Sequence, residues 1–192
     1  VKEQEIVQRL EKDAMCKYTS DKQVLLFGEE HGEFAWRDIL QFIDLFPCLK
    51  ANGFTSIAVE INSRYQKTLQ AYWENPTDIQ KEEAIREMSK TYSSWNNSPY
   101  LEDTLLITKW AKETDLEIIA LDHPGYPNFT KRRDAYMKKR IDTFLKKGKR
   151  LAVFIGKAHI KNIEHFETSF YPTITPLGYR LIQDYGKENI GS

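Results

Sequence analysis

Two Gly-x-x-His motifs are the residues of this sequence whose types and spacing could most readily do chemistry. One motif runs from Gly28 to His31 and the other from Gly156 to His159, and each follows a short apolar run, at residues 24–27 and 151–155. Such runs are typical of buried strands in a parallel sheet. Ligand sites of these sheets lie just beyond the carboxyl ends of the strands. The motifs therefore predict two histidines delivered to the same edge of one sheet.

Two further apolar runs, residues 56–59 and 118–121, also end in ionisable side chains. Glu60 follows the first of these runs, and Asp122 and His123 follow the second. Because the carboxyl ends of parallel strands meet at one edge, we expect all four runs to contribute to a single site. Asp122 and His123 are predicted to line the part of the site that binds the substrate.

The chemistry that these residue types favour is hydrolysis. His31 or His159 could take a proton from water, because histidine titrates near neutral pH. Glu29 and Glu60 could orient the imidazoles and favour their charged form, which raises a histidine pKa. Arg64 could pair with Glu60 or stabilise developing negative charge. The sequence has no Gly-x-Ser-x-Gly segment, so a serine nucleophile of that type is not expected.

Participation of a metal is left open by these residues. His31, His159, Glu29 and Glu60 have the side-chain types that bind Mn²⁺, Fe²⁺ or Zn²⁺. The same four side chains could also work without a metal.

The spacing of apolar residues predicts an α/β fold of three layers, with a mostly parallel sheet flanked by helices. Helices are expected at residues 34–52 and 131–147, and a helical insertion of about residues 65–115 separates the second and third strands. Leu181-Ile182 is predicted as a last short edge strand. The whole chain, residues 1–192, is expected to be a single domain.

Two large aromatic residues, Trp95 and Tyr100, lie in a polar loop within this insertion. They are candidates for lining the substrate cleft. As large aromatics beside a helix, they are equally good candidates for the hydrophobic core.

Composition and charge argue against several classes of protein. Hydrophobic residues make up 41% and charged residues 29% of the 192-residue chain, as in a globular domain. The net charge is zero, so nucleic acid is not expected as a partner. No apolar run approaches the roughly 20 residues of a membrane span. No signal peptide is visible. The start at Val1 fits a trimmed chain or a piece of a larger parent, so a secreted origin and the compartment stay open.

The two cysteines, Cys16 and Cys48, do not form the pattern of a disulfide scaffold or a cysteine-based zinc site. Cys48 lies among apolar residues of a predicted helix. We therefore expect Cys48 to be a buried thiol and not half of a disulfide.

A basic segment occupies residues 131–150, with ten basic residues against two acidic ones. A run of charge is usually the solvated face of a helix. This segment is also a candidate docking surface for an acidic protein or an anionic membrane.

Taken in order, these motifs resemble a superfamily that joins erythromycin esterases, ChaN-like haem-binding proteins, TraB and Tiki proteins, and a catalytic domain of large bacterial toxins. The resemblance rests on the two Gly-x-x-His motifs, with Glu60 at the end of the second strand and Arg64 nearby. Arg133-Asp134, with Met137 three residues on, is similar to the Arg-Asp-x-x-Met stretch of the family.

This resemblance implies three functions. The first is a hydrolase of the esterase or peptidase type, acting on a small molecule or a peptide. The second is haem binding, as in the ChaN-like branch, with Tyr65, Tyr72 and Tyr100 as candidate axial ligands. The third is a catalytic or remnant domain of a bacterial effector toxin.

Overall fold

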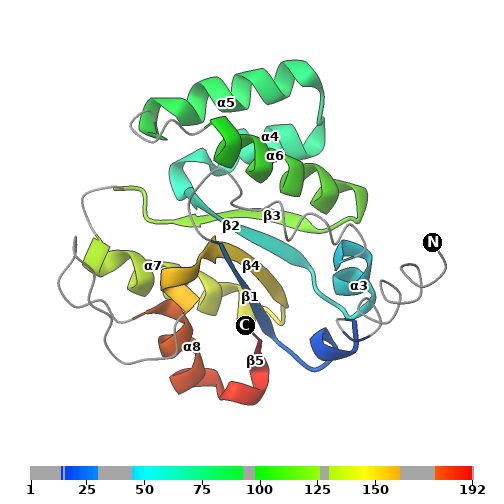
Figure 1. Ribbon diagram of the computed structural model, residues 1–192, viewed down its shortest axis with the longest axis vertical. Coiled ribbons are helices and arrows are strands. Elements are labelled where there is room, and N and C mark those ends of the chain that lie inside the picture. Colours follow the sequence, from blue (N-terminus) through cyan, green and yellow to red (C-terminus); the bar gives the residue numbers. More distant parts are fainter. Residues whose placement is uncertain are drawn as a thin grey trace, which may run out of the picture.

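The computed structural model describes residues 14, 16–29, 45–92, 98–125, 130–160 and 176–191. Within these ranges, five strands form one sheet in the order β3-β2-β4-β1-β5, and every pair of neighbours is parallel (Figure 1). The carboxyl ends of the strands therefore lie at one edge, as the sequence predicts. The strands are β1 Val24–Glu29, β2 Ser56–Asn62, β3 Glu117–Asp122, β4 Leu151–Gly156 and β5 Ile190–Gly191.

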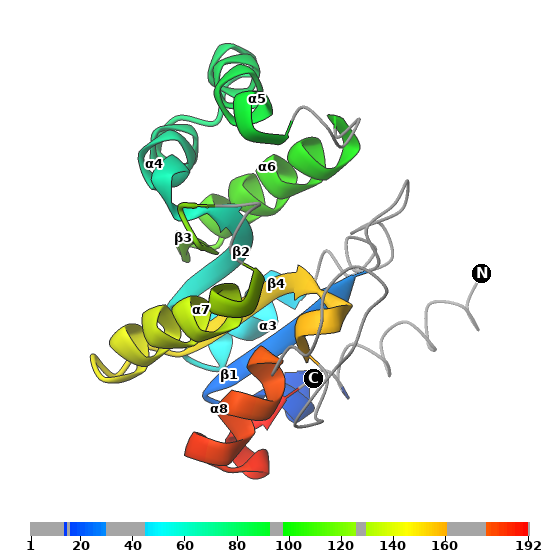
Figure 2. The same ribbon diagram turned by 90° about the vertical axis from the view of Figure 1, so that its left-hand side faces the viewer.

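Helices cover both faces of this sheet, which gives the predicted three-layer α/β arrangement (Figures 1 and 2). On one face, α3, α4 and α6 pack against alternate strand residues such as Ile57 and Phe154. On the other face, α7 and α8 pack against Ala58 and Val153. The helices are α3 Leu45–Ala51, α4 Gln66–Glu74, α5 Asp78–Tyr92, α6 Ser98–Glu113, α7 Thr130–Leu145 and α8 Leu177–Tyr185.

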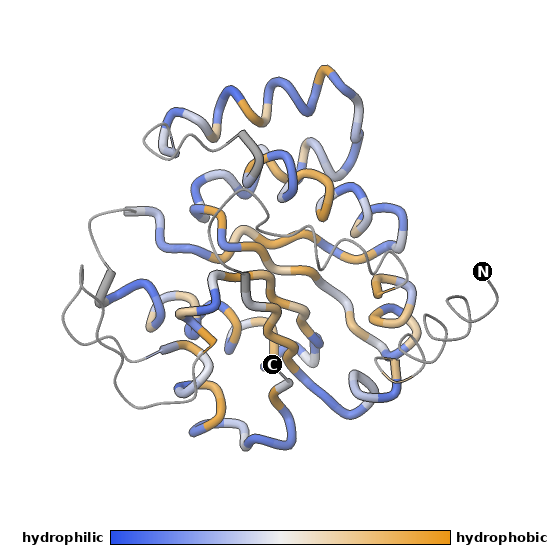
Figure 3. Tube along the Cα trace, in the orientation of Figure 1, coloured by the Kyte–Doolittle hydropathy of each residue, from blue (hydrophilic) through white to orange (hydrophobic). Residues whose placement is uncertain are grey.

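The strands are apolar along their whole length because both of their faces are covered. Every residue of β2 and of β4 is buried, and Figure 3 shows hydrophobic residues concentrated along the sheet. Strands covered on both faces have continuous apolar runs in place of the alternation of a half-exposed strand. The described helices include none that is long and apolar enough to cross a membrane.

The predicted helical insertion between the second and third strands is confirmed. It consists of α4, α5 and α6. Helix α4 ends before Pro76, whose ring cannot continue a helix, and α5 begins after it. Each helix has a buried face, which includes Leu69 in α4, Met88 in α5 and Leu105 in α6. Figure 3 shows that the outer part of α5 is mostly hydrophilic.

The prediction of an edge strand at Leu181-Ile182 is wrong. These residues lie in α8, where Leu177 and Leu181 stand about one turn apart on the buried face. The edge strand is β5, which pairs with Val24 and Leu25 of β1. Of the helix predicted over residues 34–52, only the part from residue 45 onward lies in the described ranges, as α3.

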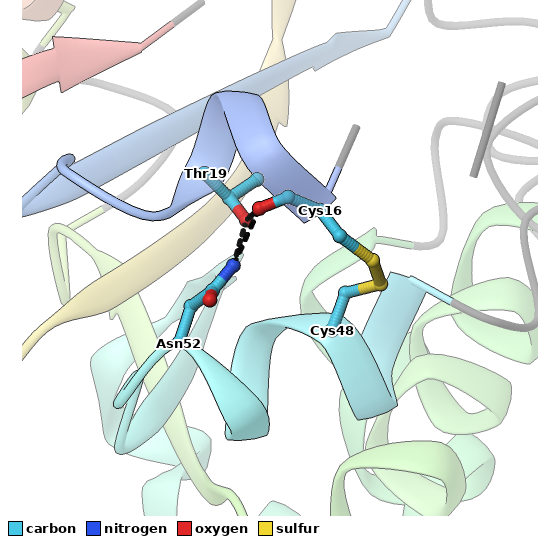
Figure 4. The surroundings of a disulfide bond; sticks show 4 residues. All are labelled: Cys16, Thr19, Cys48 and Asn52. Atoms are coloured by element: carbon cyan, nitrogen blue, oxygen red, sulfur yellow. Dashed lines mark hydrogen bonds between the residues drawn. A yellow bond between two sulfur atoms is a disulfide. The ribbon is translucent and has the colours of Figure 1, made fainter. Parts of the chain in front are cut away.

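The prediction that Cys48 is a free thiol is also wrong. Cys48 of α3 forms a disulfide with Cys16, across a Cα–Cα distance of 5.2 Å (Figure 4). Asn52 donates hydrogen bonds to the Cys16 carbonyl (2.6 Å) and to Thr19 Oγ1 (2.7 Å), which fixes the same two segments. Cys48 is buried as predicted, but the pairing depends on where the chain before β1 meets α3.

Candidate functional site

The Glu60 carboxylate is the centre of a polar cluster at the carboxyl edge of the sheet. Glu60 is only 4% exposed to solvent. Oε2 accepts a hydrogen bond from the Gly156 amide at 2.7 Å. Oε1 forms an ion pair with Arg133 and lies 3.3 Å from His159 Nε2. One carboxylate thus connects β2, the second Gly-x-x-His motif and α7.

Arg133 neutralises two carboxylates from neighbouring strands. Besides Glu60 it binds Asp122 through two hydrogen bonds, Nε to Oδ1 at 2.9 Å and Nη2 to Oδ2 at 2.8 Å. Burial raises the pKa of Asp122, and the Arg133 guanidinium opposes that shift. A buried charge must be paired and hydrogen-bonded to be tolerated, and the Arg133 guanidinium gives the buried carboxylates both a counter-charge and hydrogen bonds.

His159 lies between two carboxylates. Nδ1 is 2.7 Å from Asp134 Oδ1, and Nε2 faces Glu60. Asp134 is itself fixed, because Oδ2 accepts a hydrogen bond from the Leu177 amide at 2.7 Å. Burial would lower the pKa of His159, but Glu60 and Asp134 outweigh burial and raise that pKa to about 10. At neutral pH His159 is therefore an imidazolium that can donate a proton but cannot accept one.

Two glycines allow the turn that carries His159 to pack closely. This turn is η3, Lys157–Ile160. A Cβ atom at Gly28 would lie 2.5 Å from the Ile160 side chain, and one at Gly178 would lie 2.5 Å from the Ile160 carbonyl. Gly28, the glycine of the first motif, thus allows β1 and η3 to pack closely.

Two tyrosines of the insertion hold the carboxyl end of β2. Tyr92 Oη, from α5, accepts a hydrogen bond from the Asn62 amide at 2.8 Å. Tyr100 Oη, from α6, donates to the Glu60 carbonyl at 2.9 Å. Burial raises the pKa of Tyr92 far above its ordinary value, so its hydroxyl stays neutral. Tyr100, a candidate for both the cleft and the core, is 8% exposed and anchors the backbone of the cluster.

Three of the predicted site residues, Glu60, Asp122 and His159, meet in this cluster. The predicted Glu60–Arg64 pair is wrong, because Glu60 pairs with Arg133. After Glu60 the chain turns into η1, Ser63–Tyr65, and carries Arg64 to the rim. There Arg64 donates to Asn62 Oδ1 (3.2 Å) and to the Pro124 carbonyl (3.0 Å).

His123 lies beside the cluster with its ring held in place. Its amide donates to Asp122 Oδ1 at 2.7 Å, and its Nδ1 accepts from the Gly125 amide at 2.9 Å. The ring also contacts Tyr136 edge to face, with 4.9 Å between centroids. The acceptor at Nδ1 fixes a tautomer in which the proton of a neutral ring is on Nε2.

His31 and Trp95 lie outside the described residues, and only the backbone of Glu29 is described. That backbone is informative, because Glu29 is in register with Gly156 on the neighbouring strand. β1 therefore ends at the edge where the Gly156 amide binds Glu60. The roles assigned to Glu29, His31 and Trp95 stay predictions.

Arg133 and Asp134 are site residues that the sequence prediction omitted. In the sequence they are distinguished only by the family resemblance. The overlooked signal is their position on a helix, since Met137 and Ile141 continue the same buried face at helical spacing. Two adjacent charges on an apolar face predict buried partners.

The described residues include no group of three or more His, Cys, Asp or Glu side chains arranged to hold a metal ion. Both ring nitrogens of His159 and both oxygens of Glu60 already face protein partners. The predicted metal set also includes Glu29 and His31, whose side chains are not described, so metal binding stays a prediction.

The fold matches solved structures of bacterial toxins and effectors. The type III effector HopBA1 is 16% identical with a TM-score of 0.57, and the match covers 80% of this chain and 75% of that one. RRSP, a MARTX toxin effector domain from Vibrio vulnificus, is 20% identical with a TM-score of 0.54, over 88% of this chain and 34% of that one. The C-terminal region of Pasteurella multocida toxin, described with a thiol-protease-like catalytic triad, is 15% identical with a TM-score of 0.53, over 93% of this chain and 24% of that one.

These findings correct the predicted resemblance to the erythromycin esterase, ChaN and TraB–Tiki superfamily. No family model matches the chain, and no curated protein matches it. The matching structures described above are bacterial toxins and effectors. Two of the three tyrosines predicted as haem ligands have other roles: the hydroxyl of Tyr65 bonds Thr91 and that of Tyr100 bonds the Glu60 carbonyl. At sequence identities of 15–20%, the likeness to these solved structures shows a shared fold.

Proposed function

We propose that this chain is the catalytic domain of a bacterial effector toxin and that it hydrolyses an ester or amide bond. The observation that carries the proposal is the His159 imidazolium held between two buried carboxylates at the carboxyl edge of the sheet. A pKa raised this far by a specific charge pair is typical of functional sites. Residues 1–192 are proposed to form this one domain.

In the proposed reaction His159 is the acid. Its Nε2 proton is directed at Glu60, with a distance of 3.3 Å that leaves this hydrogen bond weaker than the one to Asp134. The Nε2 proton is therefore the one available to a leaving group, while Asp134 keeps the ring oriented. Arg133 holds Glu60 in place and is proposed to act through it as a positioning residue.

The proposed nucleophile is water, activated by His31 with Glu29 beside it. The register of Glu29 with Gly156 supports this pairing, because β1 ends at the same edge as the strand that precedes His159. A cysteine nucleophile is not supported, because both cysteines are joined in the disulfide. Two histidines with separate tasks, one neutral and one charged, match the division between general base and general acid.

The test is a screen of aryl esters and of a mixed peptide library, read by mass spectrometry in ¹⁸O-labelled water. We expect one bond class to be cleaved with a single ¹⁸O in the acid product. His159→Gln, Glu60→Gln and His31→Gln should each lose activity by a factor of about 10² or more. Lys187→Gln, an exposed position far along the chain, is the matched control and should keep full activity.

The pH profile distinguishes the two histidines. The rate should rise with pH as the proposed base His31 loses its proton, near the ordinary histidine value of about 6.5. It should fall again as pH approaches the His159 pKa of about 10. Unchanged turnover in His159→Gln would remove His159 from the mechanism, and cleavage of neither bond class by the wild-type protein would overturn the hydrolase proposal.

A further inference from the structure

The free edge of the sheet lies on β3. This strand ends the sheet order, and within the described residues it pairs with β2 alone. Figures 1 and 2 both show β3 at the margin of the sheet, with α4 on one side of it and α7 on the other. An unpaired edge presents backbone groups that can pair with another chain.

A groove of about 440 Å³ runs along this edge. Its volume falls in the range of sites that bind small ligands or short peptide segments. None of its lining residues belongs to the Glu60–His159 cluster. Its floor is Glu117, Ile118 and Ile119 of β3, and its walls are Gln66, Gln70 and Trp73 of α4 and Arg140 and Phe144 of α7.

The side chain of Gln66 already makes the bonds that a neighbouring strand would make. Its Nε2 donates to the Ile118 carbonyl at 2.9 Å, and its Oε1 accepts from the Ala120 amide at 2.8 Å. A carbonyl and an amide two residues apart are the pair that a single residue of a neighbouring parallel strand engages with its own N–H and C=O. The N–H and C=O of one such residue could replace the Gln66 amide at small net cost, because they offer the same donor and acceptor.

Arg140 gives the groove its charge. Its Nε is buried and has no hydrogen-bond partner among the described residues. Glu117, the acidic residue of the lining, is already paired with Lys149. The groove therefore contains an unmatched positive charge on the helix whose sequence is most basic, and a carboxylate would complement it.

We infer that this groove binds an acidic peptide segment in extended form, added as a parallel strand beside β3. Its backbone takes the place of the Gln66 amide, and one of its carboxylates bonds Arg140. Trp73 and Phe144 supply apolar walls for the side chains next to that carboxylate. The site is a docking surface for a partner protein and does not depend on the proposed hydrolysis.

The test uses a fluorescein-labelled octapeptide of alternating valine and glutamate, with fluorescence anisotropy at physiological ionic strength. A peptide with lysine in place of glutamate tests the charge. A valine–glutamate peptide with alternate backbone nitrogens methylated keeps the charge but cannot pair as a strand. We expect both comparison peptides to bind about tenfold more weakly, because each loses a charge-assisted or backbone hydrogen bond.

Variants separate the groove from the rest of the basic helix. Arg140→Met should weaken binding about tenfold. Lys139→Met removes the same charge from the adjacent, exposed position and should change binding by less than about twofold. Gln66→Ala frees the edge and should tighten binding. Amide resonances of Ile118 and Ala120 should shift on titration.

Three results would overturn the inference. Equal weakening by Arg140→Met and Lys139→Met would mean unspecific attraction to a basic helix. Equal binding of the methylated peptide would exclude strand addition. A failure of the valine–glutamate peptide to bind, in the wild-type protein and in Gln66→Ala alike, would mean that Gln66 and Trp73 only cover the edge. The Trp73 indole N–H donates to the Leu116 carbonyl at 2.8 Å.

Discussion

Glu60, Asp122 and Asp134 bring three carboxylates into one buried cluster, where Arg133 is the only guanidinium among the described cluster residues. If His159 were neutral, one positive charge would face three negative ones. A protonated His159 reduces this imbalance, which is why the carboxylates raise its pKa to about 10. The charge state of the histidine is thus a property of the whole cluster.

Removal of Arg133 should strongly destabilise the protein. Arg133→Met leaves the Glu60 and Asp122 carboxylates buried beside each other without their shared cation. We expect a loss of about 3–5 kcal/mol in the free energy of unfolding, measured by urea denaturation. Arg132→Met, the neighbouring exposed arginine, should change it by less than about 0.5 kcal/mol. Equal effects of the two variants would contradict the buried-pair assignment.

His159 should make stability depend on pH. Its native pKa of about 10 lies above the ordinary value of 6.5, so the folded protein binds this proton more tightly than the unfolded chain. The stabilisation is complete below about pH 6.5 and is lost as pH rises towards about 10.

Urea unfolding of wild type and His159→Gln across that interval is the measurement. The stability advantage of the wild type over the variant should shrink steadily as pH rises. A constant difference would mean that His159 does not titrate between these values, and an NMR titration of its ring would then show a lower pKa.

At the scale of elements, the insertion helices act on the site through the backbone of β2. Tyr92 and Tyr100 come from two different helices and bind two positions of one strand, Asn62 and Glu60. The Glu60 side chain leaves the strand directly before the first of these two anchors. The insertion therefore helps to position the carboxylate without contributing a charged group to the cluster.

Tyr92→Phe and Tyr100→Phe should each destabilise the fold by about 1–3 kcal/mol, because each leaves a buried backbone group without its partner. Tyr72→Phe is the matched control, since Tyr72 is buried in the same insertion without a hydrogen bond to β2. It should cost less than about 0.5 kcal/mol in urea unfolding. If the control matched the other two, the hydroxyl bonds would not be the cause.

At the scale of the whole molecule, the disulfide joins the segment before β1 to α3. Cys16 and Cys48 are 32 residues apart, so the bond closes a long loop in the unfolded chain. A loop of this length predicts a stabilisation of roughly 3–4 kcal/mol from restricted unfolded-state entropy.

Urea unfolding with and without dithiothreitol measures this contribution. The wild-type protein should lose it on reduction, whereas the Cys16→Ser/Cys48→Ser double variant should unfold identically in both conditions. Thiol labelling under denaturing conditions provides the control for the redox state. Two free thiols in the untreated protein would contradict the bond.

The sequence determined the layers of this fold through a local property, the period of its apolar residues. Runs at residues 24–27, 56–59, 118–121 and 151–155 predicted four parallel strands, because a run that is apolar throughout must be covered on both faces. The end strand was placed wrongly because β5 has only two residues, and it pairs with β1 from far along the chain. A two-residue strand carries no periodic signal.

Tertiary structure alone decided which charges meet. Arg64 is close to Glu60 in sequence, but the turn after β2 carries it away, and Arg133, far along the chain, takes its place. The sequence likewise gives no sign that Cys16 and Cys48 are bonded. They pair because the segment before β1 lies against α3 in the folded chain. Periodicity records which face of an element is buried, whereas a partner depends on how separate elements pack, and that is a property of the folded chain as a whole.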